Sequence, residues 1–129
     1  MHCPNCESEL VAFAVPQAYQ DHLPGSESAA GLCPQCLSLE PGTEPSGDPE
    51  FGRISDAFPT TAEAALPLAL LVGLLSNLAL YRNEISTLLE AVEKAGTDPL
   101  LVLDRLDRDP SVETDIDLSG RRRQLEQLL

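Results

Sequence analysis

All four cysteines of the chain lie in two matching clusters, Cys3-Pro4-Asn5-Cys6 and Cys33-Pro34-Gln35-Cys36. Thiolates are ligands that Zn²⁺ prefers, and two residues between cysteines let both thiolates of one turn reach the same ion. Proline after the first cysteine restricts the backbone and favours such a turn. The pattern predicts one closed, structural zinc site per chain, with four ligands: Cys3, Cys6, Cys33 and Cys36.

Two other uses of these cysteines are less well supported. A glutaredoxin-like thiol redox centre also uses C-P-x-C, but it needs a strand before the motif, and only two residues precede Cys3. A rubredoxin-like iron site has the same four-thiolate geometry. Such sites usually have glycine after each cysteine turn, where this chain has Glu7 and Leu37. Zinc is therefore preferred over iron.

The predicted site is structural and not catalytic. Four thiolates fill the tetrahedron and leave no position for water or substrate. The two histidines are spare candidates, but we expect His2 at a solvated terminus and His22 in a surface loop. The sequence contains no nucleophile motif, no glycine-rich phosphate loop and no convincing acid–base pair. We therefore expect no enzymatic activity and name no catalytic or cofactor-binding residue.

Short strands must bring the two cysteine clusters together. The apolar residues 10–15, which Pro16 ends, predict a strand leaving the first cluster. Residues 29–32 predict a strand that returns to the second cluster, and residues 37–39 predict one that leaves it. Residues 17–23 fit one helical turn or a further strand, and residues 24–26 predict a turn. Together these elements make a small zinc ribbon, which we assign to residues 1–40.

Residues 41–50 predict a linker, because they contain three prolines, two glycines and three acidic residues. The remaining residues, 51–129, predict a helical domain. At its start, Phe51, Ile54 and Phe58 have the spacing of one face of a short turn and predict a lid or docking segment. The expected fold class is α+β, with short antiparallel strands followed by an all-α bundle of three to four helices.

The helices follow from apolar periodicity and end signals. Thr60 and Glu63 fit a capping box. Residues 64–81 are mostly apolar and predict a buried core helix; we do not expect a membrane span, because basic residues do not flank both ends. Residues 84–95 predict an amphipathic helix that ends at Gly96. Residues 100–106 predict a third helix, begun by Asp98-Pro99 and ended near residues 109–110. An acidic loop (111–120) and a last short helix (121–129) complete the chain.

The charge balance is strongly acidic, with 21 acidic against 8 basic residues and a net charge of -13. A nucleic acid or an anionic membrane requires a basic face, so direct binding to either is disfavoured. The one basic run, Arg121-Arg122-Arg123, fits a solvated helix face better than a phosphate site. Dense carboxylates with little lysine are typical of proteins from a salt-saturated cytoplasm, where salt screens their mutual repulsion.

The whole chain resembles a small family of uncharacterised haloarchaeal proteins of similar length. The segments that carry the likeness are the two cysteine clusters, residues 54–59 (ISDAFP), 71–75 (LVGLL), 103–106 (LDRL) and 121–129 (RRRQLEQLL). The resemblance implies a cytoplasmic haloarchaeal protein with no assigned activity, in which the four cysteines are a shared feature. The place of Cys3 and Cys6 also argues against a secretion signal, which favours the cytoplasm.

Two functions fit these observations. The first is a non-enzymatic adaptor or regulator, in which a rigid zinc ribbon and an acidic helical domain bind a protein partner or a second copy of the chain. The alternative is a zinc-ribbon component of a transcription or RNA-associated machine. The acidic composition favours the first, and the identity of the partner does not follow from the residues.

Overall fold

The computed structural model describes residues 2–23, 25, 27–45 and 47–128. Its first half contains a three-stranded antiparallel sheet in the order β1-β2-β3, formed by β1 (Val11–Ala14), β2 (Ala29–Leu32) and β3 (Leu39–Pro41). β1 and β2 match the strands expected from the apolar runs. β3 begins two residues later than expected, because Leu37 lies in the cysteine turn. The turn predicted at 24–26 depends on residues 24 and 26, which lie outside the described residues.

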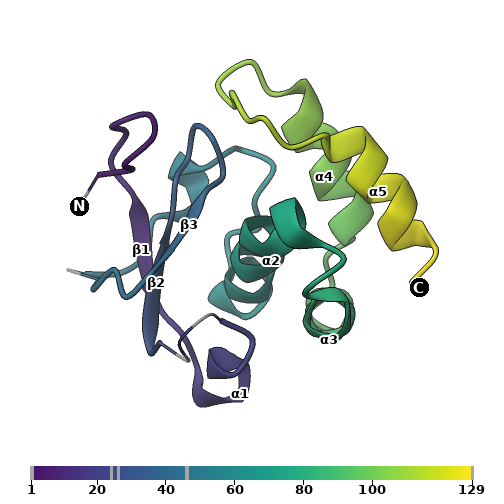
Figure 1. The fold of residues 1–129 in the computed structure, drawn as a ribbon, viewed down its shortest axis with the longest axis horizontal. Helices are drawn as coiled ribbons and strands as arrows, with labels where there is room; N and C mark the ends of the chain where they lie inside the picture. Colours follow the sequence, from purple (N-terminus) through teal and green to yellow (C-terminus); the bar gives the residue numbers. More distant parts are fainter. Residues whose placement is uncertain (1, 24, 26, 46, 129) are drawn as a thin grey trace.

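Helices follow the sheet, and the fold is α+β as predicted. The described helices of nine or more residues are α2 (Ala62–Leu74), α3 (Arg82–Lys94), α4 (Pro99–Arg108) and α5 (Leu118–Glu126). A one-turn helix, α1 (Gln17–Gln20), follows β1, and short 3₁₀ turns lie at η2 (Phe51–Arg53) and η3 (Leu75–Asn77). Figure 1 shows α2 between the sheet and the other helices, with α1 at the end of the sheet opposite the cysteine turns.

α2 is the central helix of the molecule. Its buried residues lie on every side of the helix, from Ala64 to Leu74, as expected for a helix enclosed by its neighbours. It packs on α3 on one side and contacts β3 on another. The expected apolar helix over 64–81 is too long: α2 ends at Leu74. Ser76 and Asn77 are exposed, and the carbonyl of Asn77 accepts from the Leu80 and Tyr81 amides, which turns the chain towards α3.

In the described part of the chain, no helix has the length and apolarity needed to cross a membrane.

The helix ends agree with the sequence in part. Gly96 has a φ of 90°, and Asp98 accepts from the Leu100 and Leu101 amides at the start of α4. The expected capping box is wrong, because Thr61 precedes α2 and no side chain caps it. α5 begins at Leu118 and not at Arg121, because the Asp117 carboxylate accepts from the Gly120 amide and starts the helix earlier.

One hydrophobic core joins the sheet to the helices. It includes Val11 and Phe13 of β1, Leu32 of β2 and most of the buried residues of α2, α3 and α4. The predicted docking segment lies in this core: the Phe51 ring lies 5.7 Å from Phe13 and 6.5 Å from Phe58. The cysteines form a second, smaller cluster with Leu10. The sheet that carries the cysteine turns therefore packs directly on the helices.

Candidate metal centre

The two cysteine turns have the same backbone structure. In the first, the Glu7 amide donates to the Cys3 carbonyl at 2.9 Å, and the Cys3 amide donates to Ser8 at 2.8 Å. In the second, the Leu37 amide donates to the Cys33 carbonyl at 3.0 Å, and the Cys33 amide donates to the Ser38 carbonyl at 2.9 Å. The repeated C-P-x-C pattern is thus a repeated structure, which presents two cysteines from each turn to the same point.

Both turns also require the left-handed backbone region. Glu7 has a φ of 63° and Leu37 a φ of 64°. A residue with a Cβ in this region costs about 1–2 kcal/mol, and glycine does not. In the sequence, Glu7 and Leu37 stand where a rubredoxin-like iron site usually has glycine, and this difference favoured zinc over iron. The backbone at both positions nevertheless has the conformation that glycine favours. The absence of glycine therefore gives no information about which metal binds.

These two positions give opposite predictions for glycine substitution. Glu7 is exposed, so Glu7→Gly should relieve backbone strain and raise the free energy of unfolding by about 0.5 kcal/mol. Leu37 is fully buried, so Leu37→Gly should lower it by at least about 2 kcal/mol despite the same relief. Urea unfolding of the metal-loaded variants measures both. A loss of stability in Glu7→Gly would show that the Glu7 side chain has a role of its own.

The four sulfur atoms lie at the spacing of a metal tetrahedron. Cys6 and Cys33 Sγ are 3.2 Å apart, Cys3 and Cys36 Sγ 3.6 Å, and Cys6 and Cys36 Sγ 3.8 Å. All four atoms lie within 4.8 Å of one another. A tetrahedron with Zn–S bonds of about 2.3 Å has edges of about 3.8 Å, whereas a disulfide bond is about 2.05 Å. The four cysteines form no disulfide bond with one another and could hold one metal ion.

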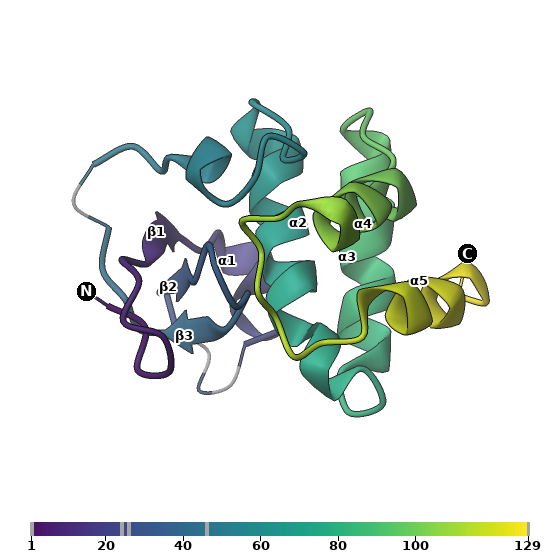
Figure 2. The ribbon, with the colours of Figure 1, turned by 90° about the horizontal axis from the view of Figure 1, so that it is seen from above.

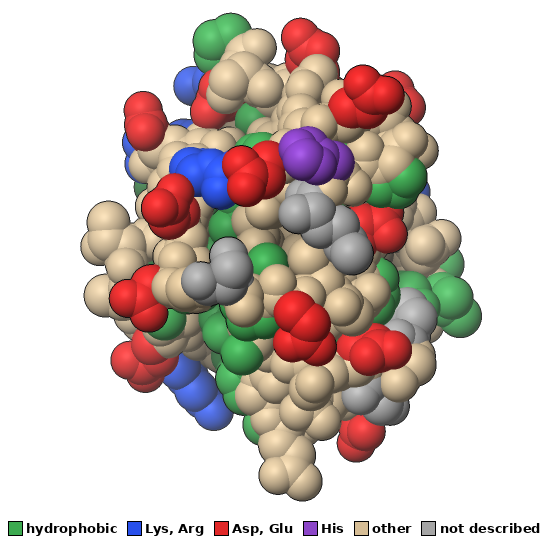
Figure 3. Space-filling view, turned by 90° about the vertical axis from the view of Figure 1, so that its left-hand side faces the viewer, with side chains coloured by type: hydrophobic (Ala, Val, Ile, Leu, Met, Phe, Trp, Pro, Cys, Tyr) green, Lys and Arg blue, Asp and Glu red, His purple; other side chains and the backbone are tan. Residues whose placement is uncertain are grey.

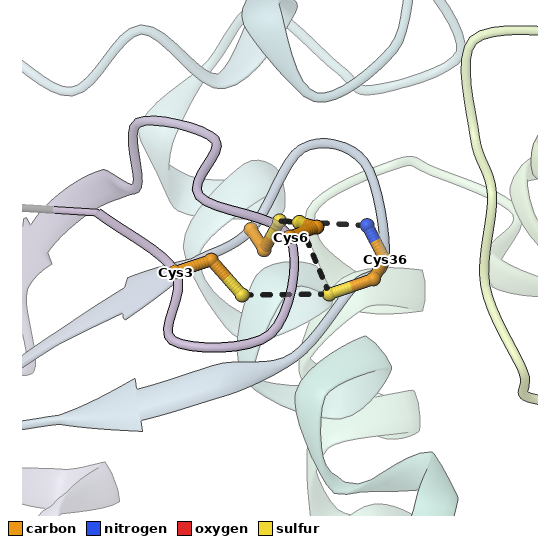
Figure 4. Close-up of side chains that lie close together, drawn as sticks. Cys3, Cys6 and Cys36 are labelled. Carbon is orange, nitrogen blue, oxygen red and sulfur yellow. Dashed lines mark hydrogen bonds between the residues drawn. The ribbon is translucent and has the colours of Figure 1, made fainter.

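Figure 4 shows how three of these side chains reach the site. Cys3 and Cys6 come from the loop before β1, and Cys36 comes from the loop between β2 and β3. Their sulfurs point towards one another across the space between the loops. Cys3 and Cys33 are buried and Cys6 and Cys36 are half-buried, so one side of the site is closer to the surface.

The thiols differ in acidity. The pKa of Cys6 is lowered to about 6, first by the Ser8 backbone amide and then by the Cys33 thiol. Burial raises the pKa of Cys33 to about 12 and also raises that of Cys3. A metal meets a thiolate at Cys6 near neutral pH, but it must displace a proton from Cys33. Metal affinity should therefore fall as the pH falls.

Hydrogen bonds beyond the cysteines join the two turns and fix them to the helical part. Ser8 Oγ of the first turn donates to the Gln35 amide oxygen of the second at 2.7 Å. Gln35 Nε2 donates to Glu113 at 2.9 Å, and the Glu113 amide donates to the Gln35 carbonyl at 2.7 Å. Glu113 belongs to residues 109–117, which we call the strap. The strap runs from the end of α4 past the second turn to α5 (Figure 2).

The strap is held at its start as well. The buried Ser55 hydroxyl donates to Asp109 at 2.6 Å, and Ser111 donates to the same carboxylate. These bonds, from Ser111 first and Ser55 second, lower the pKa of Asp109. Val112 and Ile116 are partly buried and pack on the main core. The sequence indicated only an acidic loop here. From 112 to 118, acidic residues alternate with Val, Thr, Ile and Leu, and this alternation is the signal that could have shown an extended, packed segment.

Replacing Gln35 by alanine tests this link between the cysteine turns and the strap. The variant loses two side-chain hydrogen bonds, each worth about 1 kcal/mol, but keeps all four cysteines. We expect Glu113 amide hydrogen exchange to become about tenfold faster while the bound metal remains. Asp115→Asn, an exposed change in the same strap, is the control and should leave this rate unchanged. Equal rates in wild type and Gln35→Ala would contradict the link.

Neither histidine belongs to the cysteine cluster that the described residues form. His2 is exposed, as expected, and its backbone pairs with Glu9. His22 is half-buried beside Tyr19, with ring centres 5.8 Å apart, just after α1. This places it at the end of the sheet away from the cysteines (Figure 1).

The chain belongs to a family of unknown function, DUF6276, which matches residues 2–129. No curated protein and no solved structure matches the chain significantly. Family membership therefore gives no activity or ligand.

Proposed function

We propose that the protein binds one structural Zn²⁺ through Cys3, Cys6, Cys33 and Cys36. The observation that carries this proposal is that three Sγ–Sγ distances of 3.2–3.8 Å, with all four sulfurs within 4.8 Å of one another, are close to the edges of a zinc–thiolate tetrahedron. With four thiolates, the ion has no open position for a substrate, so its role is to hold the two turns together. Iron fits the same geometry, and metal analysis distinguishes the two.

We further propose that the protein is a non-enzymatic adaptor or regulator that binds a protein partner. The cysteine turns, the strap and the helices are fixed to one another, which suits a rigid binding platform more than a moving catalytic site. Acidic side chains are scattered over the face that carries the sheet, with few basic ones among them (Figure 3). Such a face disfavours the alternative, direct contact with nucleic acid in a transcription or RNA machine.

Affinity capture and a gel-shift assay test the two functions together. In concentrated salt, the metal-loaded protein should recover one protein in constant ratio, and Cys33→Ser should recover less of it. The same preparation should not shift DNA or RNA. Salt-resistant binding of nucleic acid without a protein partner would refute the adaptor function and favour the alternative. Neither result decides whether the four cysteines bind zinc, which metal analysis tests separately.

A further inference from the structure

A small pocket far along the chain from the cysteines is lined by two arginines. It has a volume of about 160 Å³ and lies between the turn before α3 and the face of α5. Arg82, Arg121, Gln124 and Gln127 supply its polar wall, and Leu78 and Leu128 supply apolar contacts. None of the described residues that line it is acidic, although the chain has 21 acidic residues against 8 basic ones.

The two arginines, like Arg105, Arg122 and Arg123, make no ion pair within the described residues. Arg53 and Arg108 pair with glutamates or an aspartate. Arg121 donates through Nη1 to the Gln124 side chain at 2.9 Å. Its Nε is buried and has no hydrogen-bond acceptor among the described atoms. A buried N–H without an acceptor costs free energy. A ligand that accepts a hydrogen bond from the Arg121 Nε would remove this cost.

The start of α3 adds to the positive potential. Arg82 is the first residue of this 13-residue helix, and no side chain caps the helix start. The acidic residue of its first turn, Glu84, is not among the residues that line the pocket. The first turn of a helix carries partial positive charge and favours anions.

The Asp117 carboxylate lines a neighbouring hollow that shares Arg121, Gln124 and Gln127 with this pocket. The Gly120 amide first, then the Ser119 hydroxyl, and to a smaller extent the charges of Arg123 and Arg121 lower the pKa of Asp117.

We propose that this pocket binds an oxyanion group, either a carboxylate or a phosphate. The planar guanidinium groups of Arg82 and Arg121 match both kinds of oxyanion. An oxyanion in the pocket can accept from the Arg121 guanidinium, whose Nε has no acceptor among the described atoms. Clefts for drug-sized ligands measure about 300–1,000 Å³, so this pocket holds a small anion or the charged end of a larger molecule. Part of the basic run at 121–123 is thus more than a solvated helix face.

Titration of the metal-loaded full chain with sodium phosphate, and separately with sodium acetate, tests the proposal at fixed ionic strength. NMR signals of the Arg121 Nε–H and the Gln124 and Gln127 side-chain amides should move and saturate with at least one of the two. Saturation with phosphate alone indicates a phosphate site, and saturation with acetate alone indicates a carboxylate site. If neither anion gives saturable shifts at these groups, the proposal is wrong.

Arginine variants make the test specific. Arg121→Gln should weaken binding about tenfold or more, the effect of losing one charge-assisted hydrogen bond. Arg82→Gln, at an exposed position, should do the same and serves if Arg121→Gln does not fold. Arg108→Gln removes an equal charge from the exposed, Asp104-paired arginine and should leave binding unchanged. Equal weakening by Arg108→Gln would mean that only net charge matters and would overturn the site.

Discussion

Protein in which Cys33 is replaced by serine is expected to lose its metal and the order of both cysteine turns. Cys33 is fully buried, and its Sγ lies 3.2 Å from Cys6 Sγ. A serine hydroxyl is a poor zinc ligand beside three thiolates, and loss of one ligand leaves the tetrahedron open. Structural zinc supplies about 10–16 kcal/mol in zinc-finger peptides, which is more than a small sheet gains from its own contacts.

The helices should survive this change, because α2, α3 and α4 contribute many buried residues to the main core and pack on one another. We therefore expect helical circular dichroism to persist while amide exchange in residues 2–9 and 33–38 becomes fast. His2→Ala is the matched control: it removes the exposed neighbour of Cys3 and should retain one metal per chain. A Cys33→Ser protein with full metal content would contradict the assignment of this cysteine as a ligand.

Replacing Gly73 by leucine should be the most destabilising change at the contact between the sheet and the helices. A Cβ at Gly73 would lie 2.6 Å from the Leu39 Cβ of β3, closer than side chains approach. In an open helix, leucine in place of glycine stabilises by about 1 kcal/mol. Here overpacking dominates, so the free energy of unfolding should fall by up to about 3 kcal/mol in urea unfolding of the metal-loaded protein.

Two further variants separate overpacking from other causes. Gly52→Leu adds the same side chain where no atom lies within 4 Å of the new Cβ, and should change stability little. Adding Leu39→Ala to the Gly73→Leu protein makes room for the new side chain and should restore much of the lost free energy of unfolding. If Gly73→Leu were as stable as Gly52→Leu, β3 would not pack on α2, and the sheet would be tethered to the helices only loosely.

Much of the candidate site could be predicted from the sequence, because its four cysteines follow a pattern of residues that are close together along the chain. Two residues between cysteines and the proline in each cluster determine the turn, and all four cysteines are used. The strands beside the turns followed from apolar runs. Gln35 could not be recognised, because its partners Ser8 and Glu113 lie 27 and 78 residues away. No local pattern marks contacts at such separations.

The fold was predicted less completely at helix ends and in packing. An apolar run does not show where its helix stops, and the exposed Ser76 and Asn77 end α2 well before the apolar run ends at Tyr81. Asp117 was placed in a loop, although its distance from Gly120 allows a helix cap. The close contact of Gly73 with Leu39 depends on the tertiary fold. The predicted division into 1–40, 41–50 and 51–129 stays a prediction, while the core shared by sheet and helices shows that they pack together.

Metal content of the purified full chain tests the central claim most directly. Elemental analysis by mass spectrometry, paired with a count of free thiols before and after chelation, measures the ion and its ligands in one sample. The four-cysteine site predicts one zinc per chain and four thiols that react only after the metal is removed. Protein that is folded without any bound metal, or that binds metal with all four thiols still reactive, would contradict the site.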